Sequence, residues 1–231
     1  MPADDLLLLP GMMCDARLWR PQIDALAVDC RVPDTTSADN FVDMAAMVLA
    51  DAPKTFAVAG LSMGGILAFE LWRQAPERIS HMALLDTNPH ADTPDKRTMR
   101  LDQIEQVLSG QLRALAVDSL KPAYLAKAHR DDKELLGDIL DMAMDLGNDV
   151  FRRQALALKD RVDSVPTLST ITCPTTVICG IEDHICPVEY HRLMAAEIPG
   201  ARLLIIETCG HLASLEQPQV VTEALQQLLE Q

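Results

Sequence analysis

Short apolar runs that end in turn residues recur along the chain, and they constrain its fold more than any other feature. Leu6 to Leu9 is followed by Pro10 and Gly11, and the run from Thr55 to Ala59 ends at Gly60. A run that is apolar at every position is typical of a strand buried on both faces. Strands of this kind predict an α/β fold with a mostly parallel sheet of about six strands, covered by helices. The other candidate strands are Ile79 to Leu85, Thr175 to Cys179, Ala201 to Ile206 and a weaker one near Val28 to Val32.

Helical patterns alternate with these runs at both ends of the chain but not in its middle. Apolar residues at helical spacing predict helices over Asn40 to Asp51, Met63 to Ala75, Pro187 to Glu197 and about Pro218 to Leu229. Between residues 88 and 172 only helical patterns occur, at Leu101 to Leu108, Gln111 to Ser119, Lys133 to Met144 and Val150 to Leu158. An insertion of roughly 80 residues is too long for a crossover between parallel strands. We therefore expect residues 1–87 and 173–231 to form the core and residues 88–172 a helical lid or cap.

A serine lies at the junction of a predicted strand and a predicted helix, within Gly60-Leu61-Ser62-Met63-Gly64. In this setting a G-x-S-x-G motif forms a nucleophile elbow, a sharp turn that lifts the serine hydroxyl above the sheet. Glycines flank the serine because side chains there would collide with neighbouring strands. An incidental serine in a glycine-rich turn would explain the bare motif, but the strand before it and the helix after it favour a nucleophile at Ser62.

A serine hydroxyl needs a base within hydrogen-bond reach, and histidine is the natural one. His211 lies in the loop directly after the last predicted strand, and parallel sheets place functional loops at the carboxyl ends of their strands. The other histidines fit less well. His81 opens a strand at the opposite end, His129 and His191 lie in polar helical surroundings typical of a surface, and His90 begins the lid.

The acid that orients the base should follow a strand and lie between the serine and the histidine in the chain. Asp183 meets both conditions, in the segment after the strand Thr175 to Cys179. Its neighbour Glu182 and the earlier Asp86 meet them as well, so Asp183 is favoured and the other two stay open on spacing alone. For the oxyanion, backbone N–H groups are expected from Met63, which follows the serine, and from Met12, in the turn after the first strand.

Composition limits the partners. The 231 residues carry a formal net charge of −14, whereas nucleic acids and anionic membranes are bound largely through Lys and Arg. We therefore expect neither as a partner. Residues 1–5 are acidic where a secretion signal is basic, and Leu6 to Leu9 is too short for a signal or spanning helix, which predicts a cytoplasmic protein.

Six cysteines occur without an export signal, and we expect them to be reduced thiols. They are Cys14, Cys30, Cys173, Cys179, Cys186 and Cys209. Cys179 and Cys186, like His184 and His191, stand seven residues apart, which is wider than the pairs of structural zinc sites. No metal site is predicted.

With these motifs in order, the chain resembles the α/β-hydrolase superfamily over nearly its whole length. The resemblance rests on the Pro10-Gly11 turn with Trp19 downstream, on the elbow, on Gly180-x-x-Asp183 followed by Pro187, and on Gly210-His211 followed by Leu215-Glu216-Gln217-Pro218. It implies Ser62, Asp183 and His211 as a catalytic triad and the N–H groups of Met12 and Met63 as the oxyanion hole, and it favours Asp183 over Asp86.

Two features depart from the family pattern. The antiparallel strands that usually open the family's sheet have no counterpart before Leu6. The oxyanion turn reads Leu9-Pro10-Gly11 where His-Gly is common. Both leave the subclass open without changing the expected chemistry.

The resemblance leaves several reactions possible, because one fold hosts many. We expect hydrolysis of small-molecule carboxylic esters, of small to medium acyl groups, through an acyl-enzyme that needs no cofactor. A C–C bond hydrolase, lactonase or thioesterase would use the same triad, and a receptor for small ligands would use the same pocket without turnover. Cationic lid residues facing the serine would favour C–C cleavage in a small keto acid; the candidates are Arg97, Arg100, Arg152, Arg153 and Lys159.

The lid also bears on substrate size. Aromatic residues make up only 3% of the chain, so a pocket of stacked rings is not expected. Aliphatic side chains on the predicted lid helices either line the pocket or pack the lid on the body, and helical periodicity favours packing for any one of them. These residues are Leu101, Ile104, Leu108, Leu112, Leu115, Leu135, Ile139 and Met142.

Overall fold

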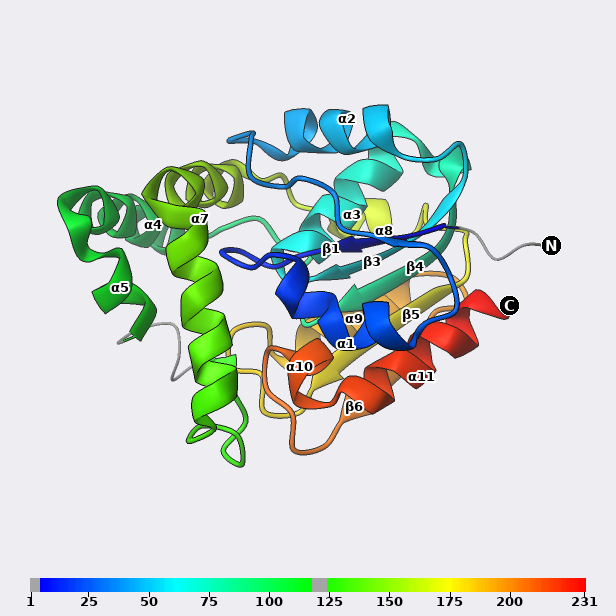
Figure 1. Ribbon diagram of the computed structural model, residues 1–231. Coiled ribbons are helices and arrows are strands. Elements are labelled where there is room, and N and C mark those ends of the chain that lie inside the picture. Colours follow the sequence, from blue (N-terminus) through cyan, green and yellow to red (C-terminus); the bar gives the residue numbers. More distant parts are fainter. Residues whose placement is uncertain (1–4, 118–123) are drawn as a thin grey trace.

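The computed structural model describes residues 5–117 and 124–231 and contains one six-stranded sheet (Figure 1). The strand order is β2-β1-β3-β4-β5-β6, and every pairing between neighbouring strands is parallel. The predicted six-stranded parallel sheet is therefore confirmed. The strands are β1 (Asp5–Leu9), β2 (Cys30–Arg31), β3 (Phe56–Leu61), β4 (Ile79–Leu85), β5 (Thr175–Gly180) and β6 (Arg202–Ile206).

The four inner strands form where the sequence is mostly apolar. All six residues of β3 and of β5 are buried, as continuous apolar runs require when helices cover both faces. The two edge strands differ. Only Cys30–Arg31 pairs within the weak candidate Val28 to Val32, and β6 exposes its first two residues.

Helices cover both faces of the sheet (Figure 1). One apolar cluster joins α2, α3 and α9 to one face, and a second joins α1 and α11 to the other. The predicted helices in these regions occur within one or two residues of their expected ends. The bounds are α1 (Arg20–Ala25), α2 (Phe41–Asp51), α3 (Met63–Gln74), α9 (Val188–Glu197) and α11 (Pro218–Leu229), with shorter elements η1 (Ala16–Trp19), η2 (Pro76–Arg78), α8 (Val165–Leu168) and α10 (Ala213–Glu216).

Between β4 and β5 the described chain forms helices and no strand. All of them except α8 gather beyond the carboxyl end of β1, on the left in Figure 1. A third apolar cluster, which includes the fully buried Val107 and Phe151, packs them against one another. The helices of this group are α4 (Pro94–Gln106), η3 (Val107–Gln111), α5 (Leu112–Leu115) and α7 (Lys133–Asp160).

Two predicted helices, Lys133 to Met144 and Val150 to Leu158, belong to one element, α7, which is interrupted at Gly147 with φ 77°. The last two residues of the predicted helix Gln111 to Ser119 lie outside the described residues, as do residues 1–4 of the acidic amino terminus. All six cysteines are free. Within the described ranges, the helices are too short or too polar to cross a membrane.

Candidate active site

Ser62 occupies a strained turn between the end of β3 and the start of α3. Its backbone has φ 55° and ψ −113°, a conformation that side chains other than glycine rarely adopt. The N–H of Ser62 donates to Leu85 O at 2.9 Å, which ties the turn to the end of β4.

The two glycines of the motif are explained by close backbone approach. A Cβ atom at Gly64 would lie 2.1 Å from Leu9 O, and one at Gly60 would lie 2.3 Å from Gly64 O. Neither position has room for a side chain, because the obstructing atoms belong to the backbone.

The side chains of Ser62, His211 and Asp183 form one hydrogen-bonded chain. Ser62 Oγ lies 2.9 Å from His211 Nε2, and His211 Nδ1 lies 2.8 Å from Asp183 Oδ2. With Asp183 ionised, Nδ1 carries the proton and Nε2 is left as the acceptor for the serine hydroxyl. The three residues come from the ends of β3, β5 and β6, which meet at one edge of the parallel sheet.

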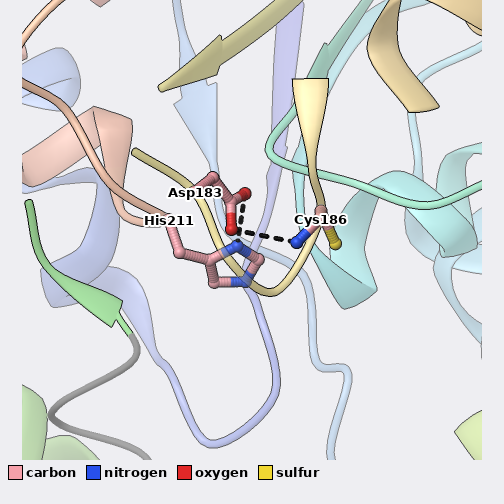
Figure 2. A group of neighbouring side chains, drawn as sticks. All are labelled: Asp183, Cys186 and His211. Carbon is pink, nitrogen blue, oxygen red and sulfur yellow. Dashed lines mark hydrogen bonds and ion pairs between the residues drawn. The ribbon is translucent and has the colours of Figure 1, made fainter. Parts of the chain in front are cut away.

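Backbone donors hold the carboxylate of Asp183 in place. The N–H groups of Ile185 and Cys186 both donate to Oδ1, at 2.8 and 2.9 Å, which leaves Oδ2 for the histidine. Figure 2 shows Asp183 between the imidazole of His211 and the backbone nitrogen of Cys186. The carboxylate is fully buried, so its orientation is set by these three donors.

The other two acids that spacing left open lie elsewhere. Asp86 is buried and accepts hydrogen bonds from the N–H groups of Gly180 (2.9 Å) and Ala213 (3.1 Å). Burial, followed by the charge of Asp183, raises the pKa of Asp86 well above its usual range. Glu182 accepts from the N–H of Lys127. Of the three acids, only Asp183 is hydrogen-bonded to His211.

Of the two residues expected to supply the oxyanion hole, Met63 directly follows the serine and Met12 borders the cavity that contains Ser62. Met63 is the first residue of α3, so its N–H has no acceptor within the helix and is left for a ligand. The next amide, that of Met13, donates to Gln154 Oε1 at 2.9 Å, and Gln154 Nε2 donates to Thr35 O. Gln154, fully buried on α7, thus fixes the turn that carries Met12.

A second buried carboxylate supports the histidine loop. Glu216 Oε1 accepts from the N–H groups of Gly210 and Leu212, on either side of His211, and Oε2 accepts from the N–H of Ala126. His129 Nδ1 also lies 2.9 Å from Oε2. The sequence indicates Glu216 only as part of the family motif Leu215-Glu216-Gln217-Pro218, and the polar Ser214 and Gln217 beside it give no sign that it is buried.

Two histidines expected at the surface lie elsewhere, and that expectation was wrong. His191 is completely buried, and its Nε2 accepts the N–H of Thr87 at 2.9 Å. Thr87 Oγ1 in turn donates to Ser62 O. His129 is half-buried against Glu216. His191 is one of three buried residues of α9, and His129 lies in the turn before α7. The polar sequence around each histidine does not reveal its buried partner.

The serine opens into a cavity of about 910 Å³ between the sheet edge and the helices of residues 94–160. Tyr124 borders it and stacks on the His211 ring, with centroids 5.7 Å apart. Of the eight aliphatic residues considered above, only Leu115 borders this cavity. Ile104 and Leu112 instead pack between the inserted helices, whereas Leu101 and Leu108 are exposed.

Of the five cations named above, Arg100 alone borders the cavity. Arg97 and Lys159 pair with Asp160, and Arg153 donates to Thr36 O at a separate cleft that Arg152 also borders. Arg161, which the sequence did not single out, also borders the cavity of the serine.

One group of described residues has ligand atoms close enough for a metal ion. Asp183, Cys186 and His211 each offer an atom within 4.8 Å of the others. The facing atoms of Asp183 and His211 are already hydrogen-bonded to each other. Burial, with the charge of Asp183, raises the pKa of the Cys186 thiol well above its usual range, so the thiol stays protonated. This chemistry does not fit a resident metal.

The chain is similar to known proteins over almost its full length. Residues 6–224 match the family model described as "Alpha/beta hydrolase family". Pimeloyl-(acyl-carrier protein) methyl ester esterase from Aliivibrio salmonicida is 26% identical over 225 residues, which cover 90% of this chain and 85% of the esterase.

Solved structures agree with this match. A thermophilic esterase from Thermogutta terrifontis, solved with malate bound, superposes with a TM-score of 0.90 at 26% identity, over 98% of this chain and 89% of that one. The enol-lactonase from Burkholderia xenovorans LB400 gives a TM-score of 0.87 at 22% identity, over 99% and 92%. The second likeness is one of fold.

Proposed function

The chain belongs to the α/β-hydrolase family, and from this premise we propose that it hydrolyses carboxylic esters of small to medium acyl groups. Ser62 is the nucleophile, His211 the general base and Asp183 the acid that orients the histidine. The observation that carries the proposal is the hydrogen-bonded chain from Ser62 Oγ through His211 to Asp183, which opens into a cavity large enough for a small ester.

Acylation follows from this geometry. His211 Nε2 takes the proton of Ser62 Oγ as the oxygen attacks the ester carbonyl. The same nitrogen then gives the proton to the alkoxy oxygen, the bond between that oxygen and the acyl carbon breaks, and the alcohol leaves. Asp183 stabilises the imidazolium that forms in between and keeps the ring in the required tautomer.

Deacylation repeats these steps with water. His211 takes a proton from water as it attacks the acyl carbon, and returns the proton to Ser62 Oγ when the acyl bond breaks. In both steps the N–H groups of Met12 and Met63 donate to the oxyanion, a contribution that is usually the largest single one in acyl transfer. The mechanism uses groups of this chain and water alone.

The experiment is a comparison of p-nitrophenyl acetate and butyrate hydrolysis by the wild-type protein and the Ser62→Ala variant. We expect the variant to lose at least about a thousand-fold in kcat. Ser109→Ala, at an exposed serine of η3, is the matched control and should behave as wild type. Unchanged hydrolysis in Ser62→Ala would contradict the proposal, and so would stoichiometric retention of the ester without turnover, which is the behaviour of a receptor.

One observation favours a second reaction on the same triad. A C–C bond hydrolase acting on a small keto acid would need a cation in the pocket, and Arg100 borders the cavity with Ser62. Assaying vinylogous diketones, lactones and thioesters beside the esters separates these reactions, because each places a different leaving group at His211.

A further inference from the structure

Three charged side chains meet where the inserted helices border the cavity of Ser62. Asp92 lies in the loop between β4 and α4, Arg100 lies on α4, and Arg161 directly follows α7. Asp92 forms ion pairs with both arginines, through Oδ2 to Arg100 Nε and through Oδ1 to Arg161 Nη1, the latter at 2.8 Å. Asp92, Arg100 and Arg161 all border the cavity, and we call them the arginine cluster.

The arginine cluster holds more positive than negative charge. The Asp92 carboxylate is fully buried, and the side chains of Arg100 and Arg161 are 14% and 4% exposed. One carboxylate therefore faces two guanidinium groups that have little water around them. A buried cation without its own counter-charge is costly, and an anion in the adjoining space would remove that cost.

The hydrogen bonds of the two arginines show which donors are left over. Arg161 Nε donates to His90 O and its Nη1 to Leu158 O, so most of this guanidinium is held by the protein. Arg100 uses Nε for Asp92. No described residue accepts a hydrogen bond from the two terminal nitrogens of Arg100. A planar pair of donors of this kind matches both oxygens of a carboxylate.

The remaining charges at this cavity, two carboxylates and one ammonium group, formally balance the excess but lie at its more exposed rim. Asp95 and Asp102 on α4 border it and are exposed, and Lys96 beside them is half-buried. Water and salt screen charges at such a rim more than charges inside. Burial lowers the pKa of Arg161, and the nearby Arg100 acts in the same direction while Asp92 opposes both. This pattern is expected where two buried cations share one acid.

We propose that the arginine cluster is a carboxylate subsite, so that the preferred substrates are esters that also carry a free carboxylate, with Arg100 as the residue that binds it. This inference rests on the proposed ester hydrolysis and adds the substrate class. The formal charge of the chain, −14, works against anionic ligands at long range. Selectivity for a carboxylate must therefore come from this local pair of arginines.

The test compares two esters that differ only at the far end of the acyl chain, monomethyl glutarate and methyl valerate, by methanol release. Wild type should show a kcat/KM roughly 10-fold or more higher for monomethyl glutarate, the size expected of a charge-assisted hydrogen bond. Arg100→Gln should lower this preference by roughly 10-fold to 100-fold, through a loss of kcat/KM for monomethyl glutarate rather than a gain for methyl valerate.

Arg97→Gln is the matched control. Arg97 lies three residues before Arg100 on α4 but is exposed and pairs with Asp160, away from the cavity. It should keep the wild-type preference. If Arg97→Gln and Arg100→Gln lower the preference equally, the effect comes from the overall charge of α4 and the proposed subsite is wrong.

Failure of the subsite and failure of ester hydrolysis give different results. Ser62-dependent hydrolysis of both esters without a preference for monomethyl glutarate would overturn the subsite alone. If neither ester is hydrolysed, glutarate binding decides. Thermal stabilisation of wild type by glutarate, absent with neutral 1,5-pentanediol and lost in Arg100→Gln, would support the subsite. Equal or absent stabilisation in wild type and variant would overturn it.

Discussion

The imidazole of His191 accepts a hydrogen bond from the backbone N–H of Thr87 inside the protein, at 2.9 Å. His191 Nδ1 lies 3.2 Å from Pro187 O, so this nitrogen carries the proton and Nε2 is the acceptor. The neutral ring thus satisfies two backbone groups at once. Since Thr87 Oγ1 donates to Ser62 O, the histidine supports, through Thr87, the turn that carries the nucleophile.

Protonation of His191 must therefore destabilise the fold. Burial lowers its pKa from the ordinary 6.5 to about 4, against the opposing charge of Asp183. Between these two values the unfolded chain binds a proton at this residue and the folded chain does not. The free energy of unfolding should accordingly fall as pH falls from 6.5 to 4, by about 3 kcal/mol in total. Urea unfolding at half-unit intervals of pH measures this slope.

His191→Gln isolates the contribution of this residue. A glutamine can still accept from one backbone group and donate to another, but it does not titrate. Its unfolding free energy should be flatter than that of wild type between pH 6.5 and 4. His184→Gln, at an exposed histidine, should keep the wild-type slope. If His191→Gln leaves the pH dependence of the free energy of unfolding unchanged, the acid sensitivity belongs to other groups.

The roles of Asp183 and Asp86, two of the buried acids near His211, can be separated by amide substitution. Asp183→Asn removes the acceptor of the Nδ1 proton and favours the wrong tautomer, so kcat should fall by roughly a thousand-fold or more. Asp86→Asn changes a residue that accepts only backbone N–H groups, and it should lower the melting temperature more than kcat. Ester hydrolysis and thermal unfolding of both variants decide the matter. A larger loss of kcat in Asp86→Asn would reverse the assignment.

The sheet could be predicted because its signal is local. Leu6 to Leu9 is apolar at every position and Ile79 to Leu85 at all but Ser80 and His81, and β1 and β4 include those residues. A strand buried on both faces carries this signal in its own sequence. The edge strand β2 is two residues long and has no such continuous run, so only its approximate place was indicated.

The supporting residues of the site could not be predicted in this way. Gln154 contacts Met13 across 141 residues of sequence, and Glu216 reaches Ala126 across 90. The sequence around Gln154 and Glu216 does not predict hydrogen-bond partners that are so far away in the chain. Arg161 follows a long helix and was indistinguishable from the surface cations around it. Its burial depends on the distant loop after β4, which supplies Asp92 and His90 O as partners.

Gln154 gives a test of this long-range support. In Gln154→Leu the N–H of Met13 and the carbonyl of Thr35 lose their partners, and each buried unpaired group costs about 1–3 kcal/mol. We expect lower stability together with a fall in kcat at nearly constant KM, because the neighbouring amide of Met12 would donate to the transition state. Gln226→Leu, on the exposed side of α11, is the control. If Gln154→Leu loses stability but keeps its kcat, Gln154 contributes to folding and not to the position of the Met12 amide.

Two glycine-to-alanine substitutions should change the free energy of unfolding in opposite directions. At Gly64 a Cβ atom would lie 2.1 Å from Leu9 O and 2.9 Å from Leu9 Cβ, so α3 would have to move away from β1. Gly64→Ala should lower the free energy of unfolding by about 3 kcal/mol or more, or prevent folding, because relieving the clash requires a whole helix to shift against the sheet. At Gly137, within α7, a Cβ atom meets nothing within 4 Å.

Gly137→Ala should therefore raise stability by about 0.5–1 kcal/mol, since alanine favours the helix and lowers the entropy of the unfolded chain. Urea unfolding of the two variants beside wild type measures both effects on one scale. The position of Ser62 also depends on the close approach of α3 to β1, so the substitution should affect activity as well as stability. If Gly64→Ala folds, its Ser62 must be displaced, and ester hydrolysis should drop even at temperatures where the variant is fully native. A Gly64→Ala protein with wild-type stability and activity would show that the close approach of α3 to β1 is not required.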